Sequence, residues 1–334
     1  MAFECVGIET YNDMATFASH RQPAWHGLGT VFDEPVTTAE MLALAHLDNW
    51  NVHLVESTPV GRYHADRFDI VRDNPFDGVL DTLGFAGSRY KVFQNEQLFG
   101  FGDAILDGGD WETAGSLRNG TVVFGSLALN REVVLDPNGA NDVIKSYLLV
   151  HTSHDGSLSI QASTTPVRVV CQNTFTMAVG ARGGKAKQSF KIRHTQTAEG
   201  KVAAAREALG IANQFLDEFD VMAQAMIQRQ VDSDQVEDIL SLAYPKPEKD
   251  SKGSFTKWEN KRDALYDIYV GKTCDNVYGT SWGIFNALTE RLDWFRNPRN
   301  GEAESVLAAA SGFDDVTNKE KARLLSIVKQ VALV

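Results

Sequence analysis

Short alternating runs of apolar and polar residues dominate the first half of the chain. Between residues 50 and 93 such runs lie between turn-forming residues, among them Pro59, Asn74 and Gly78. Strands with one buried face show this period of two, and proline, asparagine and glycine mark the turns between them. The pattern therefore predicts an antiparallel meander, with strands over residues 51–56, 67–72 and 84–92.

Two helices and a hairpin are predicted around this meander. A capping-box pattern at residues 37–40 opens a short amphipathic helix, and Asn95 is placed to cap a helix over residues 96–106. The dipeptide Asn119-Gly120 is the strongest short-range signal for a hairpin turn. We therefore expect strands on both sides of it, over residues 111–117 and 121–130.

The stretch at residues 146–179 predicts a second hairpin followed by a helix. Its first part is apolar and rich in strand-forming residues, residues 155–157 read Asp-Gly-Ser, and the residues after them alternate again. Pro166 is expected to interrupt the second strand, because proline cannot donate a backbone hydrogen bond to a neighbouring strand. Beyond it, residues 175–179 predict a short helix that begins near Asn173.

The second half of the chain changes to a helical period. Residues 201–229 repeat apolar positions at helical spacing without a proline, which predicts one long helix. Ser233 is placed to cap the next helix, and residues 248–255 form a polar linker. Further helices are predicted over residues 233–243, 257–269, 281–295 and 316–331.

These elements predict an α+β fold. A twisted antiparallel β-sheet of hairpins with packed helices occupies the front half, and the back half is helical. Three regions follow from this order: an N-terminal arm with a short helix, a β-rich core that includes a basic segment at residues 182–206, and a helical C-terminal region. Their bounds are residues 1–45, 46–200 and 201–334.

Composition narrows the class of protein. The chain has 334 residues, of which 43% are hydrophobic, so it can bury one large core or two ordinary ones. Cys5, Cys171 and Cys274 lie far apart, so no disulfide framework or cysteine-rich zinc site is encoded. No apolar run reaches the ~20 residues that span a membrane, and no secretory signal is apparent. We therefore expect a soluble, cytoplasmic protein.

The charge is distributed unevenly. The formal net charge is −12, which disfavours binding to nucleic-acid phosphates over the surface as a whole. Between Arg168 and Arg206, however, eight basic residues stand against one acidic residue, Glu199. A single basic segment on an acidic protein is typical of one anionic contact surface, and it is equally typical of a solvated loop.

Two kinds of chemistry are considered for the polar residues. His151, His154 and Asp155 carry ligand types that zinc, iron and manganese use, although histidines three apart on a regular strand point to opposite faces. Cys171 with a histidine could act as a nucleophile, but Cys171 follows Val169-Val170, where cysteine ordinarily packs as a small apolar side chain. A metal-dependent enzyme that uses His151, His154 and Asp155 therefore stays an alternative function, while no catalytic residue and no cofactor is predicted.

Five segments together resemble a known family. The segments are residues 23–29, 151–157, 165–174, 192–195 and 279–283. In this order along the chain they resemble a family of phage/plasmid-like proteins known only as a domain of unknown function, family nine-three-two. The resemblance implies a bacteriophage or plasmid origin and does not imply a chemistry.

A fold-level resemblance suggests a function. The order of a helix, two hairpins and a helix followed by a basic segment is similar to the β-β-β-α core of single-strand annealing proteins from phages and eukaryotes. That resemblance implies binding of single-stranded DNA, DNA recombination without catalysis, and self-association into a ring or filament. The residues expected to contact phosphates are Arg118, Arg168, Lys185, Lys187, Lys191 and Arg193.

A different function remains open. The acidic surface and the aromatic residues of the two helices at residues 257–269 and 281–295 could form a surface for a host or phage protein, as in an assembly or host-interaction protein. Aromatic residues at helical spacing more often belong to a core. The residues in question are Trp258, Tyr266, Tyr269, Trp282, Phe285, Trp294 and Phe295.

Overall fold

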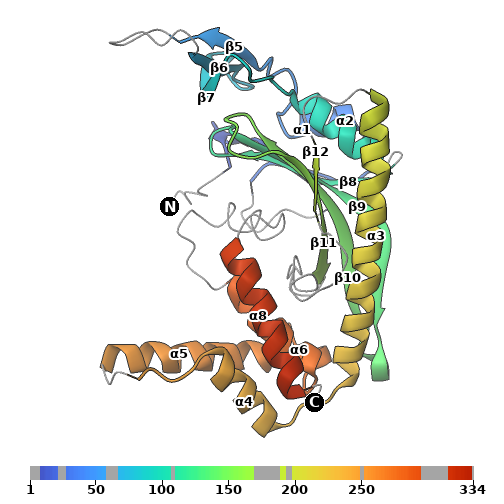
Figure 1. Ribbon diagram of the computed structural model, residues 1–334, viewed down its shortest axis with the longest axis vertical. Coiled ribbons are helices and arrows are strands. Elements are labelled where there is room, and N and C mark those ends of the chain that lie inside the picture. The colour runs from blue at the N-terminus through green and yellow to red at the C-terminus, as the bar shows by residue number, and fades with distance from the viewer. Residues whose placement is uncertain are drawn as a thin grey trace.

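A computed structural model describes eight parts of the chain. These are residues 8–21, 28–57, 67–106, 110–168, 189–192, 198–248, 252–294 and 315–332. Their elements form three sheets and a set of helices, and the α+β fold expected from the sequence is confirmed (Figure 1). Within the described residues, no helix is long and apolar enough to cross a membrane.

The main sheet has seven strands. Its order is β12-β11-β10-β9-β8-β3-β4, and every neighbouring pair is antiparallel except β3 with β4. It is strongly curved in Figure 1. The strands are β3 (Phe17–His20), β4 (Thr30–Phe32), β8 (Trp111–Leu117), β9 (Val122–Leu135), β10 (Asp142–Ser153), β11 (Ile160–Arg168) and β12 (Ser189–Ile192).

Two smaller sheets accompany it. The antiparallel sheet of β5 (His53–Glu56), β6 (Arg67–Asp73) and β7 (Leu80–Gly87) projects beyond one end of the main sheet, at the top of Figure 1. The predicted meander is therefore present, although its third strand lies earlier than the expected residues 84–92. The strands β1 (Thr10–Tyr11) and β2 (Met14–Ala15) form the third sheet.

The predicted hairpins are present and longer than expected. Pro166 does not interrupt β11, which pairs with β10 without a register shift as far as Arg168. The shift lies instead between β9 and β10, at Lys145/Ser146. Within the described residues, β12 pairs with β11 from Ile160 to Ser163, and Pro166 lies outside that stretch, where its missing N–H is tolerated. The helix expected over residues 175–179 lies outside the described residues.

The helices match the predicted elements closely. The expected cap of α1 is present as a capping box between Thr37 and Glu40, with Oε2 of Glu40 accepting from the Thr37 backbone N–H at 2.8 Å. The cap of α4 is Asp232, one residue before the predicted Ser233, and α5 begins within the expected linker. The helices are α1 (Thr38–Leu44), α2 (Asn95–Leu106), α3 (Ala198–Gln228), α4 (Ser233–Ala243), α5 (Lys252–Tyr269), α6 (Ser281–Trp294) and α8 (Asp315–Ala332).

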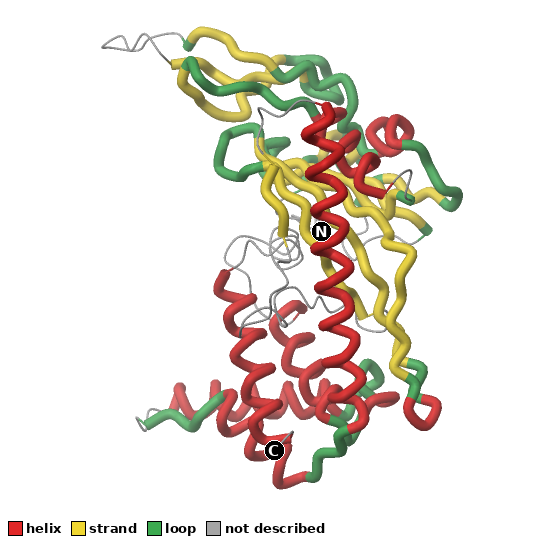
Figure 2. The backbone as a smooth tube through the Cα atoms, turned by 45° about the vertical axis from the view of Figure 1, so that its right-hand side comes forward, coloured by secondary structure: helices red, strands yellow, loops and turns green. Residues whose placement is uncertain are grey.

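Helix α3 connects two hydrophobic cores. It runs along one face of the main sheet, from α2 to α6, in both views of the backbone (Figures 1 and 2). Its Phe215 joins Trp50, Phe99 and Leu148 in a core between the sheet, α1 and α2. Its later residues, among them Met226, join a second core formed with α4, α5, α6 and α8.

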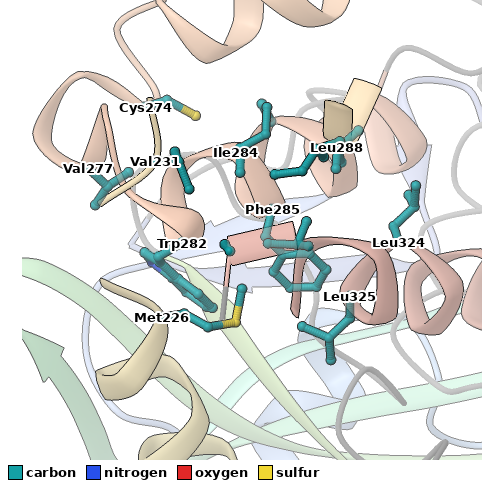
Figure 3. Close-up of a cluster of buried hydrophobic side chains, with 14 of the residues drawn as sticks. Met226, Val231, Cys274, Val277, Trp282, Ile284, Phe285, Leu288, Leu324 and Leu325 are labelled. Carbon is teal, nitrogen blue, oxygen red and sulfur yellow. The ribbon is translucent and has the colours of Figure 1, made fainter. Parts of the chain in front are cut away.

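The second core contains three of the seven aromatic residues considered for a partner surface. Tyr269, Trp282 and Phe285 are buried in it, and Figure 3 shows Trp282 and Phe285 among its side chains, so the core interpretation of these three residues is confirmed. The indole Nε1 of Trp282 donates to the buried carboxylate of Asp142 at 2.8 Å and so ties α6 to the start of β10. Tyr266 differs, because its side chain is 51% exposed.

Candidate functional site

Three connections meet at the end of the main sheet that faces the small sheet. They are the β8–β9 turn at residues 118–121, the β10–β11 turn at residues 154–159, and the β7–α2 connection at residues 88–94. We call this region the hairpin end. The backbone N–H of His154 donates to the carbonyl of Thr121 at 2.8 Å, and the hydroxyl of Tyr90 donates to the carbonyl of His154 at 3.1 Å. The three connections are therefore joined by hydrogen bonds to one residue.

His154 is fixed inside the hairpin end. Its side chain is buried against Trp50, and its Nε2 lies 2.9 Å from Oδ1 of Asn95. Asn95 Nδ2 donates to the Leu47 carbonyl, so Oδ1 is the acceptor and Nε2 of His154 carries the hydrogen. Burial, and then the nearby charge of Arg72, lowers the pKa of His154 to about 4. The ring is therefore neutral near pH 7.

Arg72 provides a buried positive charge beside this histidine. Its side chain is 0% exposed, pairs with Glu9, and lies 3.2 Å from Oδ2 of Asp81. Its guanidinium carbon is 4.1 Å from the ring centroid of Trp50, a cation–π contact. A Cβ at Gly120, which has a φ of +83°, would lie 2.2 Å from Nη1 of Arg72. Arg72 therefore links the small sheet to the β8–β9 turn, where only glycine fits.

Asp155 begins the turn after His154. Its Oδ1 accepts the backbone N–H of Ser157 at 2.8 Å. Partial burial works against ionisation, but hydrogen bonds from Ser157 and Ser153 and the charge of Arg118 together lower the pKa of Asp155. A Cβ at Gly84 would lie 2.8 Å from Cβ of Asp155, so β7 packs directly on this turn.

The residues considered for a metal site do not converge. On β10, His151 and Leu149 lie on one face of the sheet, and Val150 and Thr152 lie on the other. His154 packs on Trp50, in the core that contains Val150. Burial lowers the pKa of His151 to about 3. Within the described parts of the chain, no three His, Cys, Asp or Glu side chains are grouped as metal ligands would be.

Three of the six predicted phosphate contacts fall within the described residues, and they are spread along the main sheet. Arg118 is exposed at the β8–β9 turn and belongs to the hairpin end. Lys191 lies on β12 opposite Gln161, near the same end, and Arg168 is the last residue of β11, paired with Ile144 toward the other end. Lys185, Lys187 and Arg193, and the nucleophile candidate Cys171, lie outside the described residues.

Two basic residues of the hairpin end were missed by the sequence analysis. Arg89 and Lys91 are exposed on the connection between β7 and α2, on either side of Tyr90. The sequence predicted a strand over residues 84–92, so residues 88–92 were not recognised as part of a connection. A basic residue on each side of an aromatic one, next to Gly87-Ser88, is the signal that could have found it.

A comparison with known protein families identifies the chain. No curated protein and no solved structure is significantly similar to it. The model of one family, described as "Domain of unknown function (DUF932)", matches residues 82–312. This range covers more than half of the chain and includes the β7–α2 connection, both hairpins and most of the helical region. The chain therefore belongs to the DUF932 family of domains of unknown function.

Proposed function

We propose that this protein binds single-stranded DNA and does so without a catalytic step. The observation that carries the proposal is the set of exposed cations Arg89, Lys91 and Arg118 on two connections of the hairpin end. Hydrogen bonds to His154 hold these connections together, so the charges stand on a fixed frame. Fixed cations at one end of an otherwise acidic protein suit a chain of phosphates.

The order of elements supports the same function. Strands β9, β10 and β11 form a continuous antiparallel meander, which is the part of the expected β-β-β-α order that the described residues contain. The helix of that order, over residues 175–179, lies outside the described residues, and β12 and then α3 follow in the chain, with α3 in contact with β9, β11 and β12. In such an arrangement the protein promotes DNA recombination by binding single strands, without a catalytic step. Copies of the chain assemble in a ring or filament along the DNA. A bacteriophage or plasmid origin suits that task.

The buried histidines support binding rather than proton transfer. An efficient general acid or base has a pKa near the working pH. Burial lowers the pKa of His151 to about 3 and that of His154 to about 4, so both rings are neutral and shielded from solvent near pH 7. In the hairpin end His154 acts as a hydrogen-bonded spacer that fixes the turns.

A salt series with labelled single-stranded DNA tests the proposal. Fluorescence anisotropy of an oligothymidylate should give an affinity that falls steeply with salt, because bound phosphates release counterions. Replacing both Arg89 and Lys91 by glutamine should reduce the slope of log affinity against log salt by about 1.4, at ~0.7 for each lost contact. The matched control replaces Lys257 and Lys272, exposed at the helical end, and should leave the slope unchanged.

The basic segment is tested in the same assay. Glutamine at Lys185, Lys187, Lys191 and Arg193 together should reduce the slope by nearly 3 units if all four contact phosphates, with about 0.5 kcal/mol or less change in stability. Light scattering with DNA should show a mass well above the 36.8 kDa of one chain. A parent protein that does not bind the oligonucleotide at low salt would overturn the proposed function.

A further inference from the structure

The small sheet presents an exposed aromatic side chain on its outer face. Phe85 on β7 is 56% exposed, and Asp69 of β6 lies opposite it in register. Val55 of β5, the next position across the sheet, is 41% exposed. The guanidinium carbon of Arg67 lies 4.3 Å from the ring centroid of Phe85. Arg67 and Phe85 therefore form a cation–π pair that is exposed to solvent.

The inner face of the same sheet is fixed against the hairpin end. Gly84 packs on Asp155, and Ile70, its partner in register, is buried in the core. Successive residues of a strand point to opposite faces, so Phe85 points away from the main sheet. The pair of Arg67 and Phe85 thus stands on a sheet whose other side is anchored.

The outer face continues into the cations of the hairpin end. Arg67 pairs in register with Gly87, the last residue of β7, and Arg89 and Lys91 follow within four residues. One exposed basic residue, Arg67, therefore contacts the ring, and two more exposed basic residues, Arg89 and Lys91, follow the same strand on the connection to α2. A ring that bases can stack on, beside cations that phosphates can contact, is the combination that single-strand-binding surfaces use.

We infer that the outer face of the small sheet, around Phe85 and Arg67, is the subsite that stacks unpaired bases. The inference rests on the proposed function and adds to it the means by which single strands are preferred over duplex. In a duplex the bases are stacked on one another, so only an unpaired base can lie on Phe85. The positive charges of Arg67 at the ring and of Arg89 and Lys91 beyond the end of β7 complement the phosphates that flank that base, which favours nucleic acid as the occupant.

Substitutions of Phe85 test the subsite through affinity without changing charge. Phe85→Ser should weaken binding of single-stranded DNA about 10-fold or more, since stacking on an aromatic side chain contributes substantially to the affinity for each base. Its salt slope should equal that of the parent, because no phosphate contact is lost. Phe85→Tyr should restore the affinity, and Arg67→Gln should reduce the slope by about 0.7. The control is Tyr266→Ser, at an aromatic residue that is 51% exposed at the helical end.

The outcomes separate the subsite from the proposed function. If the parent binds single-stranded DNA and Phe85→Ser binds as tightly as the parent, the stacking subsite is wrong and the proposed function stands. If the parent fails to bind, the proposed function itself is wrong. Equal loss of duplex and single-strand binding in Phe85→Ser would also overturn the inference, because a stacking subsite acts on unpaired bases. Circular dichroism of each variant, unchanged from the parent, shows that the loss is not unfolding.

Discussion

The hairpin end and the helical end of this protein are built on different physical principles. The hairpin end buries Arg72, His154 and Asn95 and holds them with ion pairs, hydrogen bonds and a cation–π contact. The helical end packs α3, α4, α5, α6 and α8 mainly around apolar side chains (Figure 3), with one buried ion pair, Lys321 with Asp293 at 2.6 Å. The stability of a polar interior depends on pH and on each buried charge keeping its partner. The stability of an apolar interior depends mainly on how completely its volume is filled.

Removing volume from the helical end should give the largest effect. Phe285 of α6 is fully buried in the second core, so Phe285→Ala leaves a cavity. We expect the free energy of unfolding to fall by about 3–5 kcal/mol, measured by urea denaturation. The loss should be the same at about pH 7.5 and about pH 5.5, because the cavity contains no titrating group. A loss that depends on pH would contradict the comparison.

Removing the buried charge of Arg72 should lower the free energy of unfolding somewhat less. Arg72→Met leaves the carboxylate of Glu9 buried without its partner, while Asp81 can be hydrated because its side chain is 37% exposed. We expect a loss of about 3 kcal/mol, at the low end for a broken buried ion pair. The double variant with Glu9→Gln should recover part of it. No recovery would show that Arg72 acts by packing rather than by charge.

Acidification should weaken the hairpin end and adjacent sheet. The folded-state pKa values of His154 and His151, about 4 and about 3, are below the ordinary 6.5, so the unfolded chain takes up protons first as the pH falls. Stability is therefore full above about pH 6.5 and is lost progressively below it. Between about pH 7.5 and about pH 5.5, each of the two histidines should lower the free energy of unfolding by about 1 kcal/mol.

Substitution of one histidine provides the control for the acid effect. His154→Asn keeps a polar side chain of similar size beside Asn95 and removes the titrating ring. We expect this variant to lose about half of the pH dependence of the parent over the same range. A pH dependence that is unchanged in His154→Asn and in His151→Asn would show that other groups produce the acid effect.

Loss of a helix cap should have the smallest effect and should not distinguish the two ends. The α1 helix of the front half begins at a capping box with Thr37, and α4 of the helical end begins at one with Asp232. Replacing either cap by alanine should cost about 1 kcal/mol, since each removes a partner of a backbone N–H in the first turn. Thermal unfolding of the two variants should therefore give similar decreases in midpoint.

The sequence predicted regular elements better than it predicted the hairpin end. Periodicity and caps located α3, α6 and both hairpins, because local preference and burial agree there. The strand β3 was missed in the N-terminal arm because four residues are too few to show a period. Arg72 was not recognised, because its partner Glu9 is 63 residues away, and such a pairing leaves no local pattern.

The candidate site was only partly within reach of sequence reasoning. Arg118 was expected at a hairpin tip, since Asn-Gly turns place the preceding residue there. The two histidines were considered as metal ligands and were expected on opposite faces of a strand, and in the structure His151 and His154 do diverge. Phe85 was placed within a strand, and only pairing of β6 with β7 brings Arg67 to its ring.

Photo-cross-linking tests the central claim, that single-stranded DNA lies on the hairpin end and the small sheet, most directly. A single strand that carries 4-thiothymidine is irradiated with the unmodified protein, and the cross-linked peptides are identified by mass spectrometry. We predict cross-links within residues 80–91 and around Arg118, with Phe85 and Tyr90 as the aromatic sites. Cross-links confined to the helical end, over residues 252–294, would contradict the claim.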